Sequence, residues 1–427
     1  MPRGKLSLLQ LAAATYLMVS GGPYGTEELV QNCGYAGALA LVVVLPLIWS
    51  LPVGLMVGEL AAAIPAEGGF YIWVRRALGP FWGFQEAWLS LTASIFDMAV
   101  YPTLFVAYLG RLWPSATGGE RGFLIGVIFV AACVLWNLCG ARAVGGGSVW
   151  LGALLLSPFV VVVAAALVRH PLSAAAASPA HRDWLAGVLV AMWNYMGWDN
   201  ASTVAAEVEN PQRTYPRVML LALAVIMFSY VIPFAAAWRA QVPVTAWATG
   251  SWVAIAAQIA GPPLGVALLA AAMLSSFGMF NSLTLSLSRL PLAMAEVGYA
   301  PRCFARKLAN GVPWVALLAC GTAWIAALRL TFDRLLMLDI LLYGVSLILE
   351  FVALAALRIR EPKLERPFRV PGGFAGALLA GVGPALLLLI AAVVNRHEQM
   401  GSVSALTVGV GIMALGVVLY RLVPKRR

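Results

Sequence analysis

The chain has 427 residues, of which 62% are hydrophobic and only 11% are charged, and its mean hydropathy is +0.88. This is about twice the apolar excess and half the charge of a soluble protein, so the composition excludes a soluble enzyme or binding domain and indicates a lipid bilayer. The net charge of +10 does not indicate a nucleic-acid partner, because the basic residues lie between hydrophobic segments and not on a soluble module.

Apolar stretches of spanning length predict an all-α integral membrane protein of about twelve helices. At about 20 residues a span, these helices leave no room for a soluble domain, so residues 1–427 are expected to form one transmembrane domain. The predicted spans cover residues 6–31, 36–64, 81–112, 122–140, 147–168, 185–208, 216–238, 262–296, 313–329, 334–357, 374–394 and 401–423. The first span follows two basic residues, as in a signal peptide, but it is longer than such a peptide and is expected to be retained.

The Lys and Arg residues divide unequally between the two sets of loops. If residue 1 is cytoplasmic, the inner loops and termini carry 20 of the 28 basic residues and the outer loops carry 8. The outer ones are Arg111, Arg121, Arg169, Arg182, Arg239, Arg329, Arg334 and Arg396. Because cytoplasmic loops are enriched in basic residues, we expect a multi-pass protein of the plasma membrane (the inner membrane of the cell) with both termini cytoplasmic.

Residues 20–25 interrupt the first predicted span. Two adjacent glycines disfavour a helix, and Pro23 removes a backbone donor. Within hydrocarbon the exposed backbone groups survive only where they are buried in protein or line a cavity, so the break is a candidate substrate site. Its candidate binding residues are Ser20, Gly21, Gly22, Tyr24 and Gly25.

The helix that resumes after this break would present N–H groups and the positive end of its dipole, which suit a substrate carboxylate. Glu27 stands in its first turn. This residue is interpreted either as a structural partner of the dipole or as a group that binds a substrate amine.

A second break lies about 175 residues later, in the sixth predicted span. Its candidate binding residues are Trp193, Tyr195, Gly197, Trp198 and Asp199. Carbonyl groups exposed at this break would accept from a substrate ammonium, and the aromatic faces would stabilise a cation. Asp199 is equally well interpreted as a binding charge or as a cap for the following half-helix.

Paired breaks in two halves are typical of an inverted-repeat transporter. We therefore expect a first repeat over residues 1–170, an inverted second repeat over residues 185–357, and two additional helices over residues 372–423. The short stretches 65–80 and 242–258 are each expected to cover one mouth of the pathway.

Asp97 lies in the middle of the third span, with no basic residue within one helical turn. A carboxyl group at membrane depth is a functional hypothesis by default, so Asp97 is interpreted as a protonatable or amine-binding group, or else as a structural bridge between the third and sixth spans. Tyr101 follows one turn later and is assigned to the same site. In the eighth span, Ser275 and Ser276 form a possible ion site or simple helix–helix contacts.

Several separate motifs, up to about residue 310, resemble the amino acid-polyamine-organocation superfamily of permeases. They comprise residues 20–27, residues 65–71 with 79–84 and Trp88, residues 198–203 with 206–213 and Pro216, and residues 288–296 with Gly298 and Pro301. The form of the first motif, the Trp198-Asp199-Asn200 sequence, and Asp97 followed by Tyr101-Pro102 resemble the polyamine uptake permeases of plants and protozoa.

This resemblance implies a LeuT-type fold of five plus five inverted helices with two added helices. It also implies a substrate site between helices one, three, six, eight and ten, and proton coupling. Some proton-coupled relatives carry a lysine in the fifth helix, whereas residues 147–168 here contain no ionisable side chain. Coupling to protons would therefore depend on a carboxyl group, with Asp97 the first candidate and Glu27 the second.

The sequence thus predicts a secondary active transporter, not an enzyme, that moves polyamines or amino acids by alternating access in symport with protons. The alternatives are an amino-acid-specific permease or exchanger, which could use sodium, and a membrane sensor. An intramembrane enzyme is disfavoured because the three His lie in predicted outer loops without a catalytic motif. The expected partners are a small-molecule substrate and the bilayer; no metal, other cofactor or nucleic acid is expected, and the sequence indicates no oligomeric state.

Overall fold

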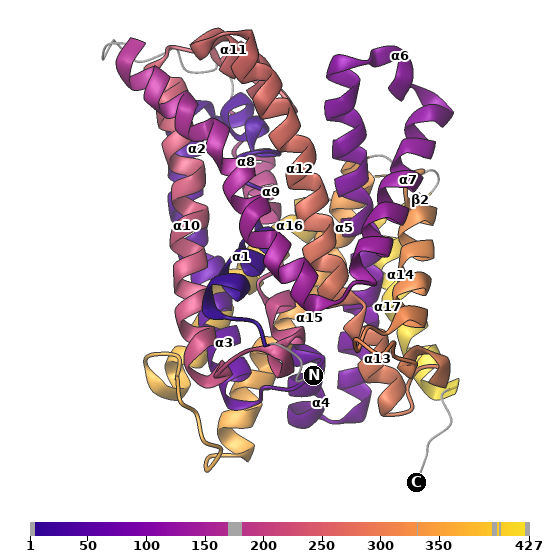
Figure 1. Cartoon of the computed structure of the whole chain (residues 1–427). Helices are drawn as coiled ribbons and strands as arrows, with labels where there is room; N and C mark the ends of the chain where they lie inside the picture. Colours follow the sequence, from indigo (N-terminus) through magenta and orange to yellow (C-terminus); the bar gives the residue numbers. More distant parts are fainter. Residues whose placement is uncertain (1–4, 170–181, 331, 395–398, 401–402, 423–427) are drawn as a thin grey trace.

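The computed structural model describes residues 5–169, 182–330, 332–394, 399–400 and 403–422, which form an almost entirely helical bundle (Figure 1). Its α-helices are α1 (Leu8–Val19), α2 (Glu27–Ile48), α3 (Ser50–Ala63), α4 (Gly69–Leu78), α5 (Pro80–Leu112), α6 (Pro114–Thr117), α7 (Gly119–Asn137), α8 (Ala141–Arg169), α9 (Trp184–Trp193), α10 (Pro211–Arg239), α11 (Trp252–Ala260), α12 (Pro262–Leu287), α13 (Arg289–Glu296), α14 (Trp314–Ala327), α15 (Phe332–Arg360), α16 (Gly373–Val394) and α17 (Ala405–Leu422). Short 3-10 helices are η1 (Asp199–Thr203), η2 (Ala205–Glu207), η3 (Val244–Ala246) and η4 (Arg302–Ala305), and strands β1 (Gln399–Met400) and β2 (Val403–Ser404) pair antiparallel.

The helix lengths agree with the predicted membrane spans. Among the described residues, nine helical segments are long and apolar enough to cross a membrane, and α1, α9 and α14 are shorter apolar helices. Together they account for the twelve predicted segments and confirm the all-α membrane fold. Residue 170 of the first predicted repeat, and residues 401–402 and 423 of the last predicted span, lie outside the described residues.

The first predicted span is divided differently from the expectation. α1 ends at Val19, and the helix that resumes at Glu27 continues as α2, where the sequence predicts a loop between residues 31 and 36. This loop is reduced to a kink at Gly34, whose φ of 70° is a left-handed value that glycine adopts without strain. In the sixth predicted span, α9 ends at Trp193, and only the 3-10 turns η1 and η2 follow the break.

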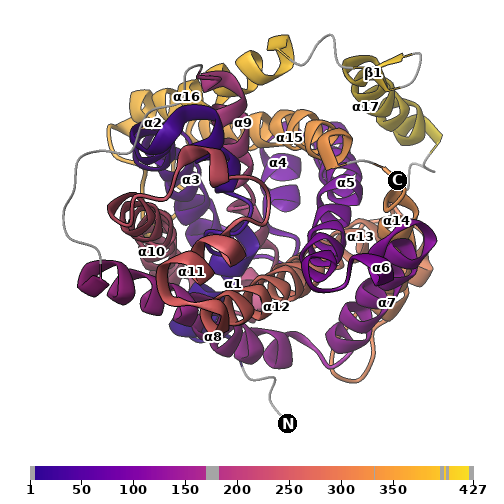
Figure 2. The ribbon, with the colours of Figure 1, turned by 90° about the horizontal axis from the view of Figure 1, so that it is seen from above.

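The two helix breaks lie inside the bundle. α1 packs against α8, α10 and α12, and Figure 2 shows it near the middle of the molecule with α16 and α17 at the rim. α5 packs along α15 and also against α4 and α12. α4 and α11, which represent the stretches predicted to cover the pathway mouths, lie at opposite ends of the bundle (Figure 1). The inverted relation of the two repeats stays a prediction.

Ion pairs hold the α4 end of the bundle together. Glu59 of α3 is fully buried and pairs with Arg358 and with Arg366, whose Nε lies 3.3 Å from Glu59 Oε1. Arg76 of α4 forms a two-pronged pair with Glu361, with N–O distances of 2.8 and 2.6 Å, and this guanidinium holds the pKa of Glu361 below its usual range. These carboxylates are therefore structural ties between α3, α4 and the end of α15.

Candidate substrate site

A small cavity lies between the two helix breaks. It is lined by residues of α1 and its break, α5, α9 and its break, α12 and α15, which are the first, third, sixth, eighth and tenth predicted spans. Its water-accessible volume is only about 40 Å³, which is space for a few water molecules. The cavity is therefore closed around a space smaller than an organic substrate.

The cavity brings together eight of the predicted site residues. They are Gly21, Tyr24, Asp97, Tyr101, Trp193, Gly197, Ser275 and Ser276. The other seven do not line it: Ser20, Gly22, Gly25, Glu27, Tyr195, Trp198 and Asp199.

Two carboxyl groups face the cavity, that of Asp97 half-buried and that of Asp339 buried. Asp97 Oδ1 accepts a hydrogen bond of 3.0 Å from Tyr101, and the Trp193 side chain also interacts with this carboxyl group. Asp339 of α15 is only 4% exposed, lines the same cavity and interacts electrostatically with Asp97. No Lys or Arg is among the described residues that line the cavity. The site thus holds negative charge without a basic partner.

Sequence reasoning missed Asp339. It lies within the predicted span 334–357, and the argument that selects Asp97, a carboxyl group inside an apolar segment with no basic residue within one helical turn, applies to it equally. Its position on α15 opposite α5 comes only from the helix packing.

Glu27 does not line the cavity, and its carboxyl group accepts hydrogen bonds from other parts of the protein. It is fully buried, and its Oε1 accepts hydrogen bonds of 3.2 Å from Tyr108 of α5 and of 3.2 Å from the N–H of Gly250. The N–H groups of Gly25 and of Glu27 itself also lie against this carboxyl group. The positive end of α2 therefore faces Glu27, and the donors expected for a substrate carboxylate are occupied.

Side chains of neighbouring helices satisfy the backbone of the first break. The carbonyl of Gly21 accepts a 2.5 Å hydrogen bond from the hydroxyl of Ser275 in α12, and that of Pro23 accepts one of 2.9 Å from Trp252 in α11. Ser20 accepts from Tyr230 of α10 at 2.6 Å. Gly22 and Gly25 have φ values of 85° and 81°, so glycine is needed at both positions.

The second break is satisfied in the same way. Tyr230 donates to the carbonyl of Asn194 at 2.9 Å, and the indole groups of Trp49 and Trp198 donate to the carbonyl of Tyr195 at 3.1 and 2.9 Å. Protein donors therefore occupy the carbonyls of Asn194 and Tyr195, two of those predicted to bind a substrate ammonium. The hydroxyl of Tyr195 itself donates to the carbonyl of Val42.

Tyr343 of α15 forms the wall between the cavity and Asp199. Its hydroxyl donates to Asp199 Oδ1 at 2.5 Å and accepts from the N–H of Gly197 at 3.1 Å. Gly197 has a φ of 89°, and a Cβ atom there would lie 2.7 Å from the carbonyl oxygen of Met18. Asp199 accordingly reaches the cavity through Tyr343, and it begins a 3-10 turn where a capped α-helix was expected.

The predicted ion site has protein partners. The Ser275 hydroxyl is used by Gly21, and Ser276 donates to the carbonyl of Ala272 one turn earlier in α12 at 3.3 Å. Among the residues that the structure describes, no group of three or more His, Cys, Asp or Glu side chains could hold a metal ion.

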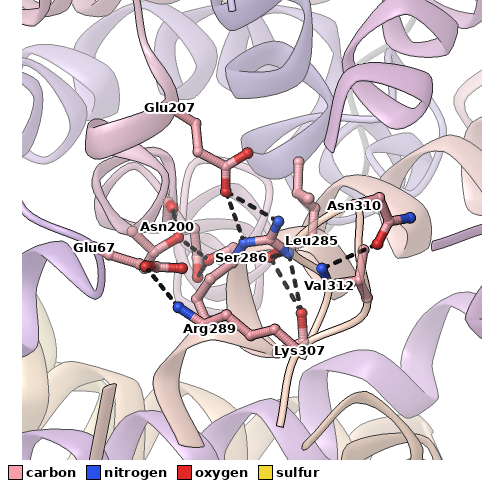
Figure 3. Close-up of polar contacts among 11 residues, drawn as sticks. Glu67, Asn200, Glu207, Leu285, Ser286, Arg289, Lys307, Asn310 and Val312 are labelled. Carbon is pink, nitrogen blue, oxygen red and sulfur yellow. Dashed lines mark hydrogen bonds and ion pairs between the residues drawn. The ribbon is translucent and has the colours of Figure 1, made fainter. Parts of the chain in front are cut away.

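Polar contacts close the pathway between the cavity and the α4 end of the bundle (Figure 3). Asn200, which lines the cavity, accepts from Ser286 of α12 at 3.0 Å. Arg289 of α13 is 4% exposed and pairs with Glu207 at 3.1 Å. Lys307 bridges Glu296 of α13 to Glu67, with N–O distances of 2.9 and 3.5 Å. Of these contacts, the Lys307–Glu67 pair joins the two predicted repeats, and the others lie within the second.

The family comparison agrees with this arrangement. Residues 6–415 match the amino acid permease family. The chain belongs to this family. Curated relatives of this permease include the polyamine transporter RMV1 of Arabidopsis thaliana, 33% identical over 410 residues that cover 95% of this chain and 84% of the relative.

The names of two other relatives specify different substrates. The polyamine transporter PUT1 of Oryza sativa subsp. japonica is 34% identical over 429 residues, covering 99% of this permease and 79% of the relative. The serine/threonine exchanger SteT of Bacillus subtilis (strain 168) is 28% identical over 338 residues, covering 76% of each chain. The permease is thus a multi-pass membrane transporter and not an enzyme, as the sequence predicts.

Proposed function

We propose that this permease is a secondary active transporter that carries polyamines across the plasma membrane by alternating access, coupled to protons. The observation that carries the proposal is the pair of cavity carboxyl groups, Asp97 and Asp339, with no basic side chain among the described residues that line the cavity. A buried charge needs a partner, and an alkylammonium group supplies both charge and N–H donors.

The surroundings of Glu27 favour a polyamine over an amino acid. An amino acid needs donors for its carboxylate, but the positive end of α2 is directed at Glu27. A substrate carboxylate in the cavity would also be repelled by Asp97 and Asp339. The relationship to a serine/threonine exchanger supports an amino acid as the second candidate.

Alternating access is supported by the closure of the cavity at both ends. On the α11 side, Tyr108 donates to Glu27 of α2 and Trp252 donates to the Pro23 carbonyl of the first break, and on the α4 side Tyr343 and Arg289 form the contacts described above. A substrate larger than a few waters enters only if one of these sets of contacts opens.

Proton coupling follows from the proximity of the two cavity acids. Two carboxylates in a low-dielectric site repel each other, so the empty site favours a proton on one of them, and an arriving ammonium displaces it. Asp97, which also interacts with Tyr101 and Trp193, is the leading carrier of this proton. The excess of basic residues in alternate loops supports cytoplasmic termini.

Uptake into liposomes that contain the purified permease tests this function. Labelled spermidine should accumulate under an inward proton gradient, unlabelled putrescine and spermidine should compete, and neutral L-amino acids should not. Competition by neutral L-amino acids together with indifference to excess polyamines would establish the amino-acid function instead. Uptake that requires sodium and ignores pH would refute proton coupling.

A further inference from the structure

A second pair of buried acids lies between the central cavity and the α4 end of the bundle. Glu86 precedes Asp97 by eleven residues in α5, and Glu350 follows Asp339 by eleven residues in α15. Both glutamates are 0% exposed. Because α5 packs along α15, each helix contributes one acid at the level of the cavity and one closer to α4.

The two glutamates belong to one cluster. Ser90 of α5 lies 3.2 Å from Glu86 Oε1 and 3.3 Å from the hydroxyl of Ser346, one turn from Glu350 in α15. The carboxyl group of Glu350 interacts electrostatically with those of Glu86 and Asp199. No Lys or Arg of the described chain donates to either glutamate.

Several acceptor atoms of this cluster have no hydrogen-bond partner in the protein. Three of its carboxyl oxygens, Glu86 Oε2 and both oxygens of Glu350, are buried and have no hydrogen-bond partner. Buried polar atoms are rarely left unpaired, and buried carboxylates need a counter-charge. A primary ammonium group offers three N–H donors and one positive charge, which matches the three unpaired acceptors.

The spacing of the two acid pairs corresponds to a long polyamine. Eleven residues of α-helix rise by about 16 Å. In a fully extended polyamine, each bond of about 1.5 Å advances the chain by about 1.25 Å. The terminal nitrogens are therefore about 16 Å apart in spermine, about 11 Å apart in spermidine and about 6 Å apart in putrescine. Asp199 interacts electrostatically with both Glu86 and Asp339, so it marks an intermediate position.

We propose that Glu86 and Glu350 form a second ammonium-binding position of the transport pathway, which holds the far amino group of a long polyamine while Asp97 and Asp339 hold the near one. This inference rests on the proposed polyamine function and adds a specificity for substrate length. Tyr343, which separates the cavity from Asp199, must turn aside for the two positions to be occupied together.

Equilibrium binding to the purified full chain in lipid nanodiscs tests the inference with spermine, spermidine and putrescine as probes. Glu350→Gln keeps the size of the side chain and removes its charge. A hydrogen bond between charged groups is worth a factor of roughly ten or more in affinity. The dissociation constant of spermine should therefore rise at least about tenfold, that of spermidine less, and that of putrescine should not change.

Glu86→Gln should likewise weaken the binding of spermine most, that of spermidine less and that of putrescine not at all. The control is Glu120→Gln, at an exposed position of α7, which should change none of the three affinities. Both buried variants should unfold at no lower temperature than the wild type without ligand, because each removes a charge that lacks a cation. An equal loss for all three amines, or no loss for spermine, refutes the second position while the polyamine function stands. A wild-type protein that binds none of the amines refutes both.

Discussion

Replacing Asp97 by Asn removes one of the two cavity charges and keeps the shape of the site. The Asn oxygen can still accept the 3.0 Å hydrogen bond from Tyr101, so the walls of the cavity should not move. A hydrogen bond to a charged group contributes about 1.5–3 kcal/mol, which corresponds to a dissociation constant about 10–150 times higher for a polyamine. Asp339→Asn should have an effect of the same size, because its carboxyl group lines the same cavity.

Direct binding of labelled spermidine to purified protein measures this loss, and thermal unfolding without ligand shows whether the fold is intact. The unfolding temperature should not fall, because the substitution relieves the repulsion between Asp97 and Asp339. Tyr101→Phe is the matched control: it removes the hydroxyl donor and keeps the charge, so affinity should change much less. Unchanged spermidine affinity in both Asn variants would show that the cavity acids do not bind the substrate.

Three further substitutions test other parts of the structure. Gly197→Ala should lower the free energy of unfolding by roughly 1–3 kcal/mol, because the new Cβ meets a carbonyl oxygen at 2.7 Å and the φ is 89°; Gly152→Ala, with open space around it, should not be destabilising in the same thermal assay. Glu361→Gln should lower the free energy of unfolding by less than about 1 kcal/mol at pH 7, since its ion pair with Arg76 is exposed. Because the pKa of Glu361 is lowered in the fold, the contribution of this ion pair should fade as the pH falls through that pKa. Urea titrations at pH 7 and pH 3 can check this. Glu207→Gln should weaken closure at the α4 end, because Arg289 loses its carboxylate partner, and cysteine-labelling of the pathway from that side should become faster.

The sequence predicts the outline of this fold because hydrophobic length and helix-breaking residues are local properties. The two breaks begin after Val19 and Trp193, close to the predicted positions. At the first of them, two adjacent glycines and Pro23 disfavour a helix through local backbone properties. The predicted loop before residue 36 was replaced by a kink at Gly34, because a glycine inside an apolar run can either continue a helix or reverse it.

The partners of polar groups could not be predicted in this way. Nothing local in the sequence indicates that Glu27 binds Gly250, or that Trp49 donates to the second break. Such contacts join residues more than a hundred positions apart, so they depend on the packing of several helices. The proximity of Asp97 to Asp339 is of the same kind, although both acids were visible inside apolar spans.

The small volume of the closed cavity has a consequence for measured affinities. Because only about 40 Å³ of this conformation is accessible to water, an organic substrate would bind only after the cavity widens, and the widened form would be the binding-competent one. The apparent dissociation constant equals the intrinsic one divided by the fraction of competent protein. A substitution that loosens the contact of Trp252 with the Pro23 carbonyl, which involves no carboxyl group, should therefore tighten apparent binding while it slows the return to the closed form.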